Sequence, residues 1–574
     1  MFKELLDKLS ISSREAVVDG THNSFDDFKN YLHVDRPVDL VLESIVISSV
    51  KSEQPRLILI SGNVGDGKSH MLAKLFNKYA DLMGSVLVRN DATESNYVSK
   101  SWIEELEDFL KPFSDDALQM KNSSKVTKIV AINLGVLSRF LNETSVSFSQ
   151  LSLFVRAKGI LENRAVAHHY YEESFFQFIN LADYKLFSLN KEGAASTLLE
   201  TLFEKITELD NSNPFYKAFN DFYSDHPYRD NCVIRFNYLQ LSKKDVQKAL
   251  INLIIYAIVK FKLIVSIRDL LNFIYDIIVP YPYQQQSSES LKSLKDYSDF
   301  YFSLKHSLYN KLFDSEGRSS LLSAIKKLDP LSLRSEKLDN LIFQLSSSEY
   351  TISYFKSQNI DLNVWRSDSF DSAEKRELVK TFVRSLYMNN LNEFNLDLED
   401  FYAYARYLYA YHTGNVSTLK TLYKIAIKAI HTWNGNARSE NEITVPIGKH
   451  QLSYNISQNI LISPTSIKVL ASRECKELYD FDTSIIVDIT AGSVNNSFTL
   501  DFNLYKLLKK VVHGYHPNKF DRDEHIDFQK FVDTIISEAS KDVKSINIEK
   551  INGSIRKRYQ LSFKNAFGYE FTTN

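Results

Sequence analysis

The chain has 574 residues, of which 44% are hydrophobic and 24% are charged, and its formal net charge is −2. This balance excludes a largely disordered chain, and the length predicts roughly two to four domains because one core rarely serves more than about 300 residues. The near-neutral charge excludes a global attraction to nucleic acid or acidic lipid, so any such contact must be local. The two cysteines, Cys232 and Cys475, show neither metal-ligand spacing nor a disulfide framework, and we expect a cytoplasmic protein.

The N-terminal residues 1–13, MFKELLDKLSISS, lack the long apolar core of a signal peptide and predict a short amphipathic helix. The most apolar segment, 249–267, is interrupted by Asn252, Lys260 and Lys262. It predicts a buried helix rather than a membrane span. We therefore expect no membrane anchor.

A glycine-rich loop follows the apolar run 57–60, LILI, and precedes apolar residues at helical spacing. It fits the pattern of a glycine, four residues, a glycine, a lysine and a serine that is typical of phosphate-binding loops. Glycines allow backbone angles closed to other residues and let backbone amides approach a phosphate. The residues expected to bind the nucleotide are Gly62, Asn63, Val64, Gly65, Asp66, Gly67, Lys68, Ser69 and His70.

The end of this loop supplies the two side chains that such a site needs. Lys68 would bring a positive charge to the β- and γ-phosphates, and Ser69 a hydroxyl ligand for Mg²⁺. A helix from about Ser69 would add the positive end of its dipole. The sequence therefore predicts an ATP site with Mg²⁺, and the alternative is a chance glycine turn.

Strand and helix patterns alternate up to about Pro280, which favours an α/β fold with a parallel sheet covered by helices. The strand candidates are residues 57–61, 85–90, 128–133, 175–180 and 232–237. Because parallel strands end at the ligand crevice, polar residues after these strands are expected near the phosphates. They are Asn90, Asp91, Asn133, Asn180 and Asn237. The alternative is that strands simply end where polar loops begin.

An acid is missing where a typical ATPase carries one to hold Mg²⁺ and polarise water. The strand 128–133 leads to Asn133 and then to leucine. Asn133 can hydrogen-bond a water or a metal ligand but cannot take a proton. Asp91 and Glu94 are the best substitutes, because they follow a strand expected to neighbour the loop, and Asp183 is another. The structural alternatives are a turn former at Asp91 and a helix cap at Glu94.

The later chain divides into two further regions. Residues 279–293 combine prolines with a polar run and predict a linker. The pattern is then mostly helical, and the tyrosine-rich stretch 401–412 predicts core or interface rather than base stacking. From about Trp433, β-like and helical runs predict an α+β domain. The expected domains are 1–280, 281–432 and 433–574.

Histidines and carboxylates crowd the stretch 513–525, HGYHPNKFDRDEH. Such residues can bind a catalytic divalent metal, and they raise the alternative of a metal-dependent nuclease. Its glycine, proline and asparagine are also typical of a tight loop, where polar residues gather anyway. The residues concerned are His513, His516, Asp521, Asp523, Glu524 and His525.

Several stretches together resemble the DptF family of phosphorothioation-dependent DNA restriction proteins. They are spread over nearly the whole chain: YLHVDRP (31–37), SGNVGDGKSH (61–70), NDATES (90–95), IVAINLG (129–135), SIRDLLNFIYDIIVP (266–280), LDPLSLRSEKLD (328–339), AIHTWNG (429–435) and HGYHPNKFDRD (513–523). The resemblance implies a P-loop ATPase that works with DptG- and DptH-like subunits in bacterial antiviral defence, restricting DNA that lacks the sulfur modification.

Under this resemblance Arg268 sits where related ATPases place an arginine that reaches the γ-phosphate from a helical lid. Its alternative is a salt bridge with Asp269 or Asp276. Arg334 could act as an arginine finger on a neighbouring subunit of a homo-oligomer, and its alternative is a solvated side chain.

We expect slow ATP hydrolysis without the partner subunits, because the usual acid is absent at Asn133. The alternative is a nucleotide-gated scaffold with little turnover. DNA is expected to bind weakly to the lone chain and mainly through the assembled complex. The local basic clusters are Lys506, Lys509, Lys510, Arg556, Lys557 and Arg558.

Overall fold

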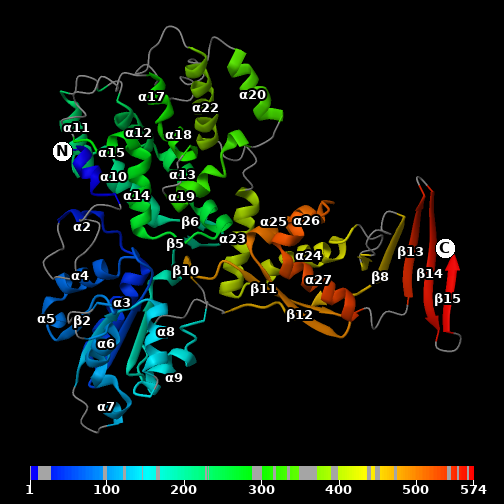
Figure 1. Cartoon of the computed structure of the whole chain (residues 1–574), viewed down its shortest axis with the longest axis horizontal. Coiled ribbons are helices and arrows are strands. Elements are labelled where there is room, and N and C mark those ends of the chain that lie inside the picture. Colours follow the sequence, from blue (N-terminus) through cyan, green and yellow to red (C-terminus); the bar gives the residue numbers. More distant parts are fainter. Residues whose placement is uncertain are drawn as a thin grey trace. The chain divides into compact units, whose positions relative to one another are not determined.

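The chain in the computed structural model (Figure 1) consists of two compact units. Unit 1 comprises Met1–Ser188, Ala195–Leu398 and Tyr479–Phe481, and unit 2 comprises Leu189–Ala194, Glu399–Leu478 and Asp482–Asn574. The residues that the structure describes are 2–10, 27–94, 100–119, 125–144, 146–162, 169–225, 229, 232–287, 300–314, 319–332, 336–347, 371–389, 398–435, 441–446, 453–470, 475–539, 545–552, 555–564 and 568–573.

Unit 1 contains a four-stranded sheet whose described strand pairs are all parallel, in the order β2-β3-β1-β4. The strands are β1 (Arg56–Ser61), β2 (Val86–Arg89), β3 (Thr127–Ala131) and β4 (Phe176–Asn180). All six residues of β1 are buried, which is typical of a parallel strand covered on both faces. The predicted α/β fold and four of the five predicted strands are confirmed.

Helices cover both faces of this sheet, and alternate β1 side chains point into two separate cores. Ile58 and Ile60 pack with the first group of helices, whereas Leu57 and Leu59 pack with the second. The first group is α3 (Pro37–Lys51), α4 (Lys68–Lys78) and α5 (Ala80–Met83). The second group is α6 (Trp102–Leu110), η2 (Lys111–Phe113), α8 (Leu134–Glu143) and α9 (Ser149–Ala157).

Beyond the sheet, most of unit 1 is helical (Figure 1). The helices are α10 (Thr197–Thr207), α11 (Pro214–Tyr223), α12 (Val233–Leu241), α13 (Lys244–Phe261), α14 (Ile267–Ile278), α15 (Tyr281–Gln284), α17 (Phe300–Lys305), α18 (Leu308–Phe313), α19 (Ser320–Lys326), η6 (Pro330–Ser332), α20 (Glu336–Ser347) and α22 (Ser372–Asn389). The shorter elements are α1 (Phe2–Asp7), α2 (Asp27–Leu32), α7 (Asp115–Gln119), η3 (Leu181–Asp183), β5 (Tyr184–Leu189), β6 (Ala194–Ala195) and β10 (Leu478–Asp480). The first of these confirms the predicted N-terminal helix.

The strand predicted at 232–237 is wrong, because these residues form most of α12. A short apolar run does not distinguish a buried strand from a buried helix. Here Val233, Ile234, Asn237, Tyr238 and Leu241 are all buried, and their spacing of three to four residues is that of one helical face.

The predicted buried helix at 249–267 is confirmed in substance, with different bounds. Helix α13 runs Lys244–Phe261 and ends where Lys262 takes a left-handed conformation with φ of 53°. Most of its residues are buried inside unit 1. No helix in the described part of the chain is both long and apolar enough to cross a membrane.

Unit 2 combines helices with two antiparallel sheets. The sheet orders are β12-β11-β9 and β15-β14-β13-β8-β7. The strands are β7 (Glu442–Val445), β8 (Tyr454–Asn459), β9 (Ile462–Pro464), β11 (Ile485–Ala491), β12 (Val494–Leu500), β13 (Ser545–Asn552), β14 (Ile555–Lys564) and β15 (Gly568–Thr573). The helices are α23 (Leu398–Thr413), α24 (Val416–Thr432), α25 (Phe502–Val512), α26 (Lys519–Glu524) and α27 (Ile526–Ala539).

The tyrosine-rich stretch lies on α23 and belongs to the core of unit 2. Phe401, Tyr404 and Tyr411 are buried, and the Tyr404 hydroxyl donates a hydrogen bond to the Leu500 carbonyl at 3.0 Å. The expected domain boundaries near 280 and 432 fall inside units 1 and 2 respectively. The three-domain division stays a prediction.

Candidate functional site

The glycine-rich loop lies between β1 and α4, in the strand, loop and helix context that its motif requires. Gly62, Gly65 and Gly67 have φ values of 150°, 91° and 95°, a region that L side chains rarely adopt. Helix α4 begins at Lys68, so Ser69, the predicted Mg²⁺ ligand, is its second residue. The predicted helix start is therefore confirmed to within one residue.

Lys68 folds back over the mouth of the loop. Its ammonium donates hydrogen bonds to the Gly62 carbonyl at 2.7 Å and the Asn63 carbonyl at 2.8 Å. Burial lowers the pKa of Lys68, while the carboxylates of Asp66 and Asp91 oppose that shift. The charge of this lysine is thus held at the loop, where a phosphate would be a stronger partner than a carbonyl.

Asp66 stabilises the loop from inside. Its carboxylate accepts a hydrogen bond from the Asn63 amide at 2.6 Å. Burial raises the pKa of Asp66, and the Asn63 amide, Lys68 and Arg36 oppose that rise. Val64, in contrast, is 84% exposed at the tip. The loop therefore presents its backbone to solvent while one buried carboxylate maintains its shape.

The start of α14 packs against the loop at Gly65. A Cβ atom added at Gly65 would lie 2.7 Å from the Ser266 hydroxyl oxygen and 3.2 Å from the Arg268 Cβ. Ser266 and Asp269 form a capping box that begins α14 at this point. The Arg268 backbone is therefore beside the loop, although about 200 residues of chain separate the two, and its predicted role toward a γ-phosphate stays a prediction.

The segment before α3 contacts the loop on another side. Arg36 donates a hydrogen bond to the Asp66 carbonyl at 3.2 Å, and its guanidinium lies 3.5 Å from the position of a Cβ at Gly67. Asp39 accepts the Arg36 backbone amide at 2.7 Å, and Pro37 occupies the first turn of α3. Because the helix start orients Arg36, the arginine is held against the loop backbone.

Two histidines, His33 and His70, stack where this segment meets α4. The His33 Nδ1 lies 2.8 Å from the His70 Nε2, and the rings are tilted by 22°. Burial lowers the pKa of both rings, and that of His70 falls to about 3. Both imidazoles are therefore neutral at pH 7, with one ring donating its proton to the other.

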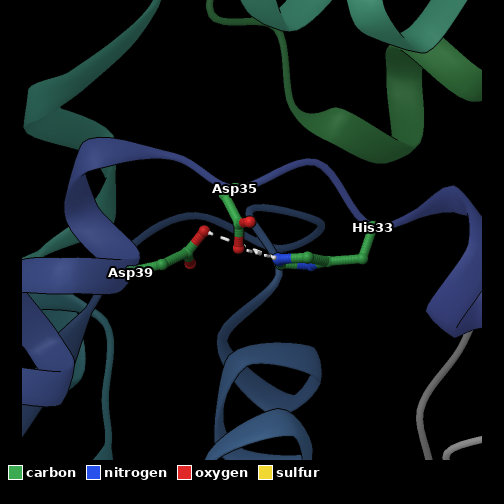
Figure 2. A group of neighbouring side chains, drawn as sticks. All are labelled: His33, Asp35 and Asp39. Carbon is green, nitrogen blue, oxygen red and sulfur yellow. Dashed lines mark hydrogen bonds and ion pairs between the residues drawn. The ribbon is translucent and has the colours of Figure 1, made fainter.

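Carboxylates surround the other side of His33 (Figure 2). Its Nε2 lies 3.1 Å from Asp35 and 3.8 Å from Asp39, and the ligand atoms of all three residues lie within 4.8 Å of one another. The Lys74 ammonium lies 2.6 Å from the same Nε2 and forms an ion pair with Asp35. Lys74 thus already supplies a positive charge to this cluster, where a metal ion would otherwise be needed to balance the carboxylates.

Asn133 follows β3, which pairs directly with β1. Its side-chain oxygen accepts the Val136 amide at 2.8 Å and caps α8. This is a structural use of the residue predicted to bind water or a metal ligand. Its catalytic role stays a prediction.

Asp91 follows β2, which pairs with β3, so β3 lies between the strand before Asp91 and the strand β1 that leads into the loop. Chain order does not reveal that β3 lies between them. Asp91 accepts hydrogen bonds from the amide and hydroxyl of Thr93 at 2.8 and 2.7 Å, as a turn former does. Its charge still acts on Lys68, and Glu94 is exposed at the end of the same turn.

A third polar residue that was expected near the phosphates, Asn180, lies close to the loop. Asn180 ends β4 beside Ser61 and donates to the Asp183 carboxylate at 2.7 Å. The following η3 contacts the loop, because a Cβ at Gly62 would lie 3.1 Å from the Leu181 Cβ. Asp183, a candidate for the missing acid, is therefore buried near the loop.

The expectation for Asn237 is wrong. It lies on α12 and donates to the Ile278 carbonyl at 3.1 Å, at the end of α14 opposite the loop. It also accepts the Leu308 amide at 2.6 Å. Since α14 has 12 residues, these ends are about 18 Å apart. Arg334 and residues 95–99 lie outside the described residues.

The stretch 513–525 does not gather its histidines and carboxylates. Asp521 accepts the Asn518 amide at 2.9 Å in a capping box for α26. It also accepts a hydrogen bond from the Tyr515 hydroxyl at 2.6 Å. His513 bonds to the Lys509 carbonyl at 2.6 Å. Among the residues that the structure describes, only the His33 group has three such side chains within metal-ligand distance.

Sequence reasoning missed the contribution of residues 33–39 to this site. The arginine, proline and aspartate that begin α3 are a readable helix start, as are Ser266 and Asp269 at α14. Both helix starts pack against the same loop, but this contact joins residues far apart in the sequence, and no local pattern predicts it. Comparisons with protein-family models, curated proteins and solved structures find no match for this chain.

Proposed function

We propose that this chain is an ATP-binding and ATP-hydrolysing P-loop subunit of a bacterial DNA restriction complex. The observation that carries the nucleotide site is the loop itself: three glycines at positive φ, with Lys68 bonded across its carbonyls. These residues fit a phosphate, because loop amides and an ammonium then bind one anion. Mg²⁺ would be held by Ser69, and when bound it would neutralise charge on the phosphates.

Three segments around the loop support the same proposal. The starts of α3 and α14 and the turn after β4 all pack against its glycines. Arg268 lies on α14, in the helical part of unit 1, and would bind a γ-phosphate from there. Arg36 would keep the loop backbone in place. Nucleotide occupancy would thus be transmitted to elements distant in the sequence.

The restriction role rests on the resemblance of the sequence to the DptF family. It places the chain in the cytoplasm with DptG- and DptH-like subunits, acting on DNA that lacks phosphorothioate. A nucleotide-gated scaffold is the second candidate. It is favoured by the use of Asn133 as a helix cap and of Asp91 as a turn former.

Phosphate release distinguishes an ATPase from a scaffold. The lone chain should hydrolyse ATP slowly, and the partner subunits should raise the rate, because an arginine in trans is worth roughly 10³- to 10⁵-fold in other P-loop enzymes. If Asp91 polarises water, Asp91→Ala should lower the rate by roughly 10²-fold or more, and Glu94→Ala tests its neighbour. Asp108→Ala, an exposed carboxylate on α6, is the control. Fast hydrolysis by the lone chain that survives both substitutions contradicts the proposal.

A further inference from the structure

The C-terminal sheet of unit 2 separates its side chains by charge and ring content. In the antiparallel pairs, residues directly opposite each other share a face, and faces alternate along each strand. We call one face the ring face. Its residues on β8, β13, β14 and β15 include Tyr454, Ile546, Ile548, Lys550, Lys557, Tyr559, Leu561, Phe563, Tyr569 and Phe571.

Ring contacts confirm this assignment. Tyr559 and Phe571 stack with centroids 5.2 Å apart and planes 19° apart, and Phe563 contacts Tyr569 at 5.2 Å. Tyr569 is 75% exposed, Phe571 58% and Phe563 45%. Three neighbouring large rings on one sheet face are thus open to solvent, which is unusual for an isolated surface.

The opposite face holds all the carboxylates of the five strands, and each has a partner. Glu442 accepts from Ser457 at 2.6 Å and from Asn547 at 2.7 Å. Glu549 pairs with Arg558 at 3.9 Å, and Glu570 pairs with Lys564. Charge on that face is therefore balanced within the sheet.

The ring face carries only positive charge from these strands. Lys550 and Lys557 lie directly opposite each other on β13 and β14, and Lys550 also lies 5.8 Å from the Tyr454 ring centroid. Like charges in directly opposed positions destabilise a sheet. An anion bound between them would remove that repulsion.

We propose that the ring face binds single-stranded nucleic acid. Phosphates would lie at Lys550 and Lys557, and unstacked bases would lie on the exposed rings, the combination used by sheets that bind single strands. A neutral apolar partner is disfavoured, because it would bury both lysines without a counter-charge. A duplex is disfavoured because its base faces are already stacked. This surface is independent of the proposed ATP site.

The test is fluorescence anisotropy of a labelled single-stranded oligonucleotide of about 15 nucleotides with the full chain, over a salt series. Tyr569→Ala with Phe571→Ala should weaken binding roughly tenfold or more and leave the salt dependence unchanged. Lys550→Gln with Lys557→Gln should weaken binding and lower the log–log salt slope by about 1.4, since each phosphate contact on a single strand contributes about 0.7.

The control is Lys564→Gln, which removes a positive charge from the opposite face and should change binding little. Circular dichroism and thermal melting check each fold. If the double ring variant does not fold, Tyr569→Ser alone replaces it, because that side chain is mostly exposed. Equal loss in the control, no effect of the rings, or tighter binding of a duplex overturns the proposal. The proposal is also overturned if the oligonucleotide does not bind and the ring-face variants instead dissociate a complex with another protein.

Discussion

The loop 62–69 and the stretch 513–525 both contain residues that can bind a ligand, yet the structure uses them differently. Around the loop, the starts of α3 and α14 and the turn after β4 all converge on glycine backbone. In 513–525 His513 and Asp521 bond within the stretch or to the helix end before it, and Arg522 bonds to Asn434. A motif becomes a candidate site when separate segments meet at its ligand-binding groups, and the histidines and carboxylates of 513–525 do not come within metal-ligand distance of one another.

The largest expected effect tests the loop side of this comparison. Lys68→Ala should weaken ATP binding by roughly 100-fold or more, because a charge-assisted contact of about 3 kcal/mol is lost. Folding should be unaffected in thermal melting. The control is Lys78→Ala on the same helix, whose ammonium pairs with Glu43 at 2.9 Å. An equal loss in both variants would remove the special role of Lys68.

Two glycines with nearly equal φ sharpen the comparison. Gly65 has φ of 91° and Gly514 has φ of 95°, but only Gly65 has neighbours within 4 Å of an added Cβ. Either substitution by alanine should cost about 1 kcal/mol for the left-handed backbone. Gly65→Ala should cost about 2 kcal/mol more through contact with Ser266 and weaken ATP binding at least about tenfold.

Chemical unfolding and calorimetry on both glycine variants check this expectation. Equal costs for the two alanines, or full ATP affinity in Gly65→Ala, would show that α14 does not press on the loop.

The histidine pair beside the loop predicts a pH dependence of the free energy of unfolding. The pKa of His70 is about 3 in the folded chain, below the ordinary value near 6.5. As the pH falls through this window, the unfolded chain binds a proton that the folded chain does not. Stability present at pH 7 is therefore lost below about pH 6.5, by at most about 1.4 kcal/mol per pH unit.

His70→Gln should flatten this loss between about pH 6 and pH 4 in urea unfolding of the full chain. An unchanged slope would mean that the stacked rings do not exclude the proton. The window concerns stability, and ATP affinity is measured separately at each pH.

The smallest effects compare two helix caps. Asn133 caps α8 and Asn518 caps α26, each through its side-chain oxygen, at 2.8 and 3.0 Å. Alanine at either position should cost about 1 kcal/mol in chemical unfolding. If Asn133 acts only as a cap, Asn133→Ala leaves ATP turnover unchanged at a temperature where the chain is folded. A large loss of turnover would assign it a catalytic role.

Local signals in the sequence predicted the loop, the helix after it and four parallel strands, because each depends on nearby residues. They failed at 232–237, where a short apolar run fits a strand or a helix equally well. They also do not reveal that β3 lies between β2 and β1, because strand order depends on how the sheet assembles. The sequence indicates both helix starts, but it does not predict that Arg36 and Ser266 pack against the loop, because that contact depends on the assembled fold.

Calorimetric titration of the full chain with Mg·ATP tests the central claim most directly. The account predicts one site with a dissociation constant well below about 1 mM, with no heat of binding in Lys68→Ala at the same concentrations. Absence of binding by the wild-type chain, or binding that Lys68→Ala leaves unchanged, would contradict the assignment of the loop as a nucleotide site.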